Sequence, residues 1–285
     1  MTSCLVKLTQ IAPDLTKSEK KAADYILQHP QEVIGLPVSQ LAERASVSGS
    51  AIIRLCKRMN FSGYREFAFE MSKEYSAIKT DPNIEYSDFH IGDDIRITSQ
   101  NVCKQNQTAI DTTCQILDFE MLQAAAAALD KARRIDFFGI GASSIVAMDA
   151  QQKFLRLGKQ CNYITDLHLQ LLNTASMSQG DVGLFISYSG TTNEVVRSLS
   201  LAKSKGATTI SITKFGENPV SALADIQLYV SALEPQMRIG AIGSRISQLT
   251  MVDILYTHVV ASRYEHYKDI LIGAKKTVQE LKEKG

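Results

Sequence analysis

One stretch in the C-terminal half constrains the fold of this chain more than any other. The apolar run Val182–Ile186 leads into the hydroxyl-rich segment Ser187–Glu194, and apolar residues at helical spacing follow it. A buried strand therefore opens into a turn and runs directly into the first turn of a helix. Unpaired N–H groups and the helix dipole make such a helix start an anion site. We expect the hydroxyls of Ser187, Ser189 and Thr192 to add donors around a phosphate. The turn has no lysine, which excludes the Walker arrangement.

Strand-like and helical patterns alternate along the whole C-terminal part. Short apolar runs are typical of buried strands and occupy 135–138, 161–165, 182–187, 208–213 and 226–231. Helical patterns fill the gaps, which predicts a five-stranded parallel sheet covered on both faces, a three-layer α/β domain. Ligands of such sheets bind beyond the strand carboxyl ends where the strand order reverses, so the loops after Phe138 and Ile186 should meet there. Two last helical patterns, 246–262 and 269–284, should pack against the sheet or a partner subunit.

A second glycine-containing turn, Gly139–Ser144, follows the first of these strands. It partly matches the dinucleotide fingerprint G-x-G-x-x-G, and Asp166 stands where a ribose-binding acid would. Ser144 replaces the third glycine, however, and a dinucleotide site would not require the hydroxyl turn at 187–192. We therefore interpret Ser143 and Ser144 as sugar or phosphate donors at a helix start, with simple N-capping as the alternative.

The motif Ser187-x-Ser189-Gly190-x-Thr192 after a strand resembles the phosphate loop of sugar isomerase (SIS) domains. The similarity extends upstream to 137–144 and downstream through 205–213, and it covers roughly residues 122–262. SIS domains bind phosphosugars, so the resemblance implies a phosphosugar site at six residues: Ser143, Ser144, Ser187, Ser189, Thr192 and Glu194. Glu194 fits equally well as a sugar-hydroxyl acceptor or as an acid that stabilises the first helical turn.

The N-terminal part reads as consecutive helices. Thr16–Glu19 has the form of a capping box, and His29-Pro30 ends the helix that it opens. A short helix over 38–45, the turn Ser46-Val47-Ser48 and a helix through Met59 form a helix-turn-helix pattern. In such a unit the second helix enters the DNA major groove. We therefore predict an all-α helix-turn-helix bundle.

Positive charge gathers on the second helix of this pattern. Arg54, Lys57, Arg58 and Arg65 lie in a segment without an acidic residue before Glu66, as phosphate contacts require. A solvated face of an ordinary helical bundle is the alternative, and Arg54 could serve packing instead. The predicted DNA contacts are Ser48, Ser50, Ala51, Arg54, Lys57 and Arg58.

The segments Leu41–Ser48 and Ile52–Phe67 resemble the N-terminal domain of the RpiR family of bacterial transcription regulators. That family joins a helix-turn-helix domain to a C-terminal SIS domain, so the resemblance covers most of the chain. Two departures are visible: Ala51 stands where the family commonly has threonine, and Met59-Asn60 replaces a typical Leu-Gly. The first changes a possible DNA contact, and the second affects only the helix end.

Composition and length bound the remaining possibilities. A chain of 285 residues is expected to form two domains, and its formal charge of +1 gives no global indication of nucleic-acid or membrane binding. Five scattered cysteines favour neither disulfides nor a metal site. Without a signal peptide or membrane span, we expect a cytoplasmic protein. The predicted domains are 1–78 (helix-turn-helix), 79–107 (acidic linker and the start of a connecting helix) and 108–285 (SIS).

These patterns lead to a ranked functional hypothesis. We expect a DNA-binding repressor of carbohydrate metabolism genes, a homodimer or homotetramer controlled by a phosphosugar, with no catalysis, cofactor or metal. The alternative is a phosphosugar isomerase with an accessory helical domain, whose acid–base candidates would be Glu194 and His168. A pure interaction protein is disfavoured by the intact hydroxyl loop. In the segment 238–245, Arg245 could reach a phosphate or fix a subunit interface.

Overall fold

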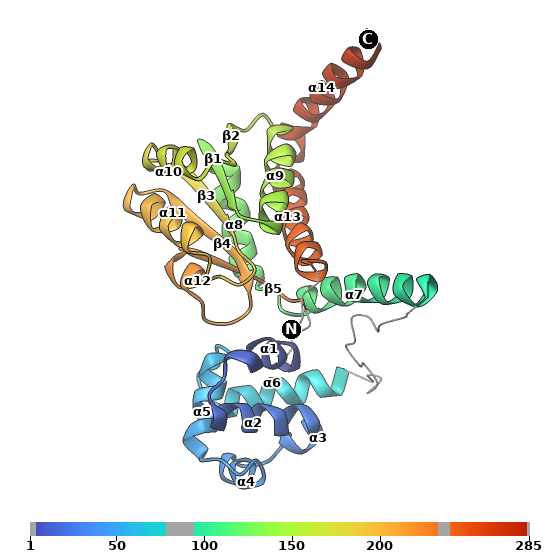
Figure 1. Ribbon diagram of the computed structural model, residues 1–285, viewed down its shortest axis with the longest axis vertical. Helices are drawn as coiled ribbons and strands as arrows, with labels where there is room; N and C mark the ends of the chain where they lie inside the picture. Colours follow the sequence, from blue (N-terminus) through green and yellow to red (C-terminus); the bar gives the residue numbers. More distant parts are fainter. Residues whose placement is uncertain (1–3, 78–93, 233–239, 284–285) are drawn as a thin grey trace. The chain divides into compact units, whose positions relative to one another are not determined.

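The computed structural model describes residues 4–77, 94–232 and 240–283, and it contains two compact units (Figure 1). One unit comprises Met1–Leu117 with Phe215–Glu217 and Ser231–Gly243, and the other comprises Asp118–Lys214, Asn218–Val230 and Ser244–Gly285. The predicted boundary at 107/108 falls inside helix α7 (Ile95–Gln115). Residues 79–93 of the predicted acidic linker lie outside the described residues. No described helix is long and apolar enough to cross a membrane.

The N-terminal domain is a helical bundle, as predicted. Its helices are α1 (Cys4–Ile11), α2 (Lys17–Gln28), α3 (Pro30–Val33), α4 (Val38–Arg44), α5 (Gly49–Arg58) and α6 (Tyr64–Ala77), with a 3₁₀ turn at Ala12–Asp14. The fully buried core includes Leu8, Ile26, Leu41, Ile52, Leu55, Met59 and Phe67. The helices expected from Thr16, over 38–45 and from Ser48 are confirmed, whereas α1 and α6 were not anticipated.

Two left-handed residues set the ends of the helices in the helix-turn-helix. Ser46 has φ 53° after α4, and the N–H of Val47 donates to the carbonyl of Ala42 at 2.9 Å. Asn60 has φ 64° after α5, and Phe61 donates to Cys56 at 3.0 Å. Asparagine tolerates this conformation better than most residues, so Asn60 can end α5 without a glycine.

The second domain contains the predicted five-stranded, all-parallel sheet. Its strands are β1 (Arg134–Gly139), β2 (Cys161–Tyr163), β3 (Asp181–Ile186), β4 (Thr208–Lys214) and β5 (Ile226–Val230), in the order β2-β1-β3-β4-β5. The chain moves outward from β1 to β2, returns past β1 to β3, and continues to β4 and β5. The order therefore reverses between β1 and β3.

Right-handed crossovers determine which helices cover which face of this sheet. The β1–β2 connection and the later connections run in opposite directions, so their helices lie on opposite faces. Figure 1 accordingly shows α10 (Leu167–Ala175), α11 (Asn193–Ser204) and α12 (Pro219–Leu223) together, opposite α9 (Ala142–Leu155) and α13 (Gly243–Ser262). Lys153 of α9 pairs with Asp253 of α13 at 3.0 Å, and Gln123 of α8 (Phe119–Lys131) lies 2.9 Å from His258 of α13. Helix α14 (Tyr264–Glu283) ends the described chain.

Candidate functional site

The two predicted ligand loops start side by side. Gly139 and Ile186 are the last paired residues of β1 and β3, and the loops that follow leave the sheet at its carboxyl edge. Neighbouring strands lie about 4.8 Å apart, so this pairing places the loop starts next to each other. The strand order reverses at this point, where open α/β sheets bind their ligands. The prediction that the two loops meet here is confirmed.

The loop after β3 is held by backbone bonds on both sides. The N–H of Ser187 donates to Ile212 at 3.0 Å, and Lys214 donates to the carbonyl of Tyr188 at 2.8 Å. The chain then turns at Gly190, whose φ of 68° is unfavourable for any residue with a Cβ atom. A Cβ at Gly190 would also lie 2.0 Å from Oδ1 of Asn218. Both conformation and space therefore require glycine.

Asn218 supports this turn and was not predicted from the sequence. Its Oδ1 accepts from the N–H of Ser221 at 2.8 Å, which caps α12, and its Nδ2 donates to Thr213 at 3.1 Å. The N–H of Val220 donates to the carbonyl of Gly190 at 3.0 Å. The Asn218-Pro219 pair is a helix-start signal, but its contact with a loop 28 positions earlier has no sequence signature.

The hydroxyl groups of the loop after β3 bond to one another. Ser187 Oγ and Thr192 Oγ1 lie 3.1 Å apart, and Ser187 is buried. Ser189 Oγ accepts from the N–H of Thr191 at 3.3 Å and lies 3.0 Å from its hydroxyl. Three predicted residues, Ser187, Ser189 and Thr192, thus lie in one compact loop. Hydroxyls exchange such partners readily, because each can donate and accept.

The loop after β1 brings its backbone close to the strand end. A Cβ at Gly139 would lie 2.4 Å from the carbonyl oxygen of Ser143, so only glycine permits this approach. The hydroxyl of Ser144 donates to the carbonyl of Gly141 at 2.6 Å. Ser143 is buried, and its hydroxyl lies 3.3 Å from Oε1 and 3.2 Å from Nε2 of Gln248 on α13. Gln248 was not predicted as a site residue from the sequence.

Helices α9 and α11, which follow these two loops, begin without a side-chain cap. Gly141, which has no side chain, precedes α9, and the side chain of Thr192, which precedes α11, does not accept from the first helical N–H groups. In the same domain Asp118, Asp166 and Asn218 cap α8, α10 and α12. The uncapped helices therefore keep N–H donors for an anion at the shared edge of the sheet.

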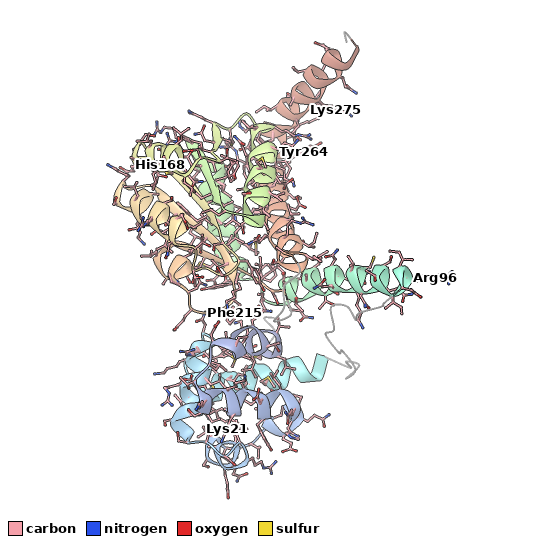
Figure 2. All side chains as sticks on the ribbon, in the orientation of Figure 1. Lys21, Arg96, His168, Phe215, Tyr264 and Lys275 are labelled. Atoms are coloured by element: carbon pink, nitrogen blue, oxygen red, sulfur yellow. The ribbon has the colours of Figure 1, made fainter. Side chains whose placement is uncertain are left out.

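The remaining polar candidates have different surroundings. Glu194 is exposed in the first turn of α11, consistent with either of its predicted roles. His168 is exposed on the first turn of α10, where Figure 2 labels it, and α10 also starts at the carboxyl edge of the sheet. Arg245 is half-buried on the first turn of α13, and Arg238 lies outside the described residues. No group of three or more His, Cys, Asp or Glu in the described parts of the chain could hold a metal ion.

In the N-terminal domain, α5 presents the predicted recognition surface. Ser48 caps this helix by accepting from the N–H of Ala51 at 3.3 Å, and its hydroxyl lies 2.9 Å from that of Ser50. Ser48, Ser50, Arg54 and Lys57 are exposed. Ala51 has no exposed area, so its methyl group packs in the core rather than on this surface.

Two of the predicted basic residues are held by a buried carboxylate. Glu19 of α2 is buried, and its two oxygens lie 3.5 Å from Nε of Arg54 and 3.9 Å from Nε of Arg58. Glu19 also accepts from the N–H and hydroxyl of Thr16 at 3.1 and 2.7 Å. Burial opposes ionisation, but the Thr16 bonds and the two guanidinium charges hold the pKa of Glu19 below its usual value.

Arg58 makes a further contact, because its guanidinium donates to the carbonyl of Asp14 at 2.8 Å. Both arginines therefore have a structural role in joining α2 to α5, and Arg58 is only half exposed. Lys57 is exposed and lies between them in the sequence. Arg54 and Arg58 pair with Glu19 in the described structure, whereas Lys57, the third cation of α5, does not.

Comparison with known proteins agrees with this two-part architecture. The model described as "Helix-turn-helix domain, rpiR family" matches residues 2–78, and the SIS domain model matches residues 128–258. The chain is 40% identical over 266 residues to an HTH-type transcriptional regulator of Caldanaerobacter subterraneus, covering 93% of each chain. It is 35% identical over 283 residues to the HTH-type transcriptional regulator YbbH of Bacillus subtilis, covering 99% of each. The chain belongs to the RpiR family of HTH-type transcriptional regulators.

Solved structures share the same fold. The Vibrio vulnificus NanR protein complexed with ManNAc-6P has a TM-score of 0.62 and 26% identity, covering 98% of this chain and 99% of that one. The sugar isomerase domain of an RpiR transcription factor from Sphaerobacter thermophilus has a TM-score of 0.56 and 18% identity, covering 62% of this chain and 98% of that one.

Proposed function

We propose that this protein is a cytoplasmic repressor of carbohydrate metabolism genes that binds operator DNA through α5 and a phosphosugar through its SIS domain. The observation that carries the ligand assignment is the pair of uncapped helices, α9 and α11, which start at the strand-order reversal beside five serine and threonine hydroxyls. An anion placed there meets N–H donors, the positive helix ends and hydroxyl groups together.

The NanR comparison supports a sugar phosphate as the class of effector. NanR is described in complex with ManNAc-6P, and it matches this chain over nearly its full length. We therefore place the phosphate at Ser187, Ser189 and Thr192, and the sugar toward Ser143, Ser144 and Glu194. A binding panel should include N-acetylmannosamine 6-phosphate, glucose 6-phosphate, fructose 6-phosphate and inorganic phosphate.

The residues that we propose to contact DNA bases lie at the exposed start of α5. Ser48 and Ser50 lie at the N-terminal end of α5, the part of a recognition helix that reaches base edges. Lys57 and the outer parts of Arg54 and Arg58 supply contacts to the DNA backbone. A helix-turn-helix reader of this kind binds paired half-sites, so we propose a homodimer or homotetramer.

The deciding experiment couples the two sites. Genomic fragments retained by the protein are sequenced to identify the operator, which is then titrated with and without each sugar phosphate. A true effector should change operator affinity roughly 5–150-fold, the usual range of allosteric coupling. The Ser189→Ala/Thr192→Ala variant should keep its sugar-free operator affinity but respond less to the effector. If it keeps the full response, the effector binds elsewhere.

An isomerase with an accessory helical domain is the second candidate. His168 and Glu194 both lie in the first turns of helices at the carboxyl edge of the sheet, where an acid–base pair could act. The full-length regulator relatives favour binding without turnover. Incubation with the same panel separates the candidates, because conversion of any sugar phosphate would contradict the sensor assignment.

A further inference from the structure

One buried face of α13 changes from apolar to polar toward the start of the helix. Residues at intervals of three and four positions share a helix face. From the third turn onward this face buries Met251, Val252, Leu255 and Val259. The first turns instead bury Ser244, Ser247 and Gln248. Hydrophobic packing explains the first group but not the second.

Gln248 is the most demanding of these polar residues. Its side chain carries a primary amide, the residue is only 1% exposed, and a buried amide is costly unless it is hydrogen-bonded. Both of its polar atoms lie within 3.3 Å of Ser143 Oγ. The amide offers two N–H donors and a carbonyl acceptor, whereas one hydroxyl has a single proton to donate. Among the described residues Ser143 is its hydrogen-bond partner, so the amide has capacity beyond that one contact.

We propose that Gln248 completes the phosphosugar site and recognises the sugar rather than the phosphate. A phosphate dianion accepts hydrogen bonds, and the uncapped start of α11 with its hydroxyl loop already supplies donors. A sugar hydroxyl or acylamino group both donates and accepts, which matches a carboxamide beside a serine hydroxyl. Ser143 stands between the loop after β1 and Gln248. The two side chains therefore form one polar pair for the sugar.

This inference rests on the proposed function, and it can be tested separately because it predicts weaker binding of the sugar but not of the phosphate. Replacing Gln248 with methionine keeps the length of the side chain and removes its hydrogen bonds. Inorganic phosphate should bind the Q248M variant within about twofold of wild type. The hexose 6-phosphate that binds wild type best should bind roughly 5–30-fold more weakly, the loss expected for one or two hydrogen bonds at a buried site.

The experiment uses the full-length protein, with calorimetry for the hexose 6-phosphate and thermal-shift titration for inorganic phosphate. Met251→Leu, on the same buried face, is the matched control and should leave both affinities within twofold. Ser143→Ala combined with Q248M should lose less than the sum of the single losses, because both act on one part of the sugar. If Q248M does not fold, Gln248→Asn shortens the amide by one methylene and permits the same comparison.

Three outcomes would overturn the inference. Equal weakening of phosphate and hexose 6-phosphate would mean that Gln248 only orders the loop. Unchanged affinity for the hexose 6-phosphate would show that Gln248 makes no contact with the sugar. If wild-type protein binds none of the hexose 6-phosphates, the proposed function itself fails and the inference fails with it. If wild type and Q248M bind the hexose 6-phosphate equally well, the inference alone is refuted.

Discussion

Gly190→Ala tests whether the loop after β3 depends on Asn218. Two separate costs arise at this position. A residue with a Cβ at φ 68° pays about 1–2 kcal/mol for the left-handed conformation. The new methyl group would also lie 2.0 Å from Asn218 Oδ1, so Asn218 must leave its place. Its departure removes the cap of α12, about 0.5–2 kcal/mol, and the bond to Thr213, about 0.5–1.5 kcal/mol.

The expected destabilisation by Gly190→Ala is therefore roughly 2–5.5 kcal/mol, of which about half to two thirds comes from Asn218. Gly180 supplies the matched control, because it has φ 89° and a Cβ there would meet no atom within 4 Å. Gly180→Ala should cost only the conformational part, about 1–2 kcal/mol. The free energy of unfolding of both full-length variants is measured in urea by circular dichroism. If the two variants lose equal stability, the contact between Gly190 and Asn218 does not constrain the loop.

Two further predictions concern the N-terminal domain. The pKa of Glu19 lies below its usual 4.5, so its ionised carboxylate contributes stability that is complete above that pH and is lost as pH falls through the lower pKa of the folded state. The Glu19→Gln variant should therefore be less stable than wild type at pH 7. Its melting temperature should also depend less on pH between pH 3 and 7. Lys57→Ala should reduce the salt slope of DNA binding by about one without changing stability, whereas Arg58→Ala should also lower the melting temperature because it breaks the Asp14 contact. Equal melting temperatures for the Lys57 and Arg58 variants would contradict the structural role assigned to Arg58.

The sequence was sufficient to predict the helix-turn-helix, the five strands of the sheet and the meeting of the two loops. Parallel strands all end at one edge, so the loops after Phe138 and Ile186 could be placed together without any side-chain detail. The capping residue Ser48 and the helix that follows it were predicted for a similar reason, since both depend on neighbouring residues. Local patterns and chain connectivity carry this information.

The contacts that the sequence did not reveal join distant residues. Gln248 meets Ser143 across 105 positions, and Asn218 supports Gly190 across 28. The charge of Arg58 alone predicts a DNA contact. In the structure, however, its guanidinium pairs with Glu19 and donates to the carbonyl of Asp14, which lie in other parts of the bundle. Such pairs depend on how helices pack, and a polar residue on an otherwise apolar helix face is the only local signal. That signal was present at Gln248, one turn before Met251.

The distribution of helix caps separates the residues that stabilise the SIS domain from those that serve its proposed ligand. A side-chain cap is worth about 0.5–2 kcal/mol, and Asp118, Asp166 and Asn218 provide one to α8, α10 and α12. Thr192 is a residue type that commonly caps, yet its hydroxyl lies 3.1 Å from Ser187 instead of accepting from the N–H groups of α11. At α9 the preceding residue is Gly141, which has no side chain to offer. Helices α9 and α11, which flank the strand-order reversal, thus lack the stabilisation that a side-chain cap provides. A bound phosphate would accept from the N–H donors left at these two helix starts.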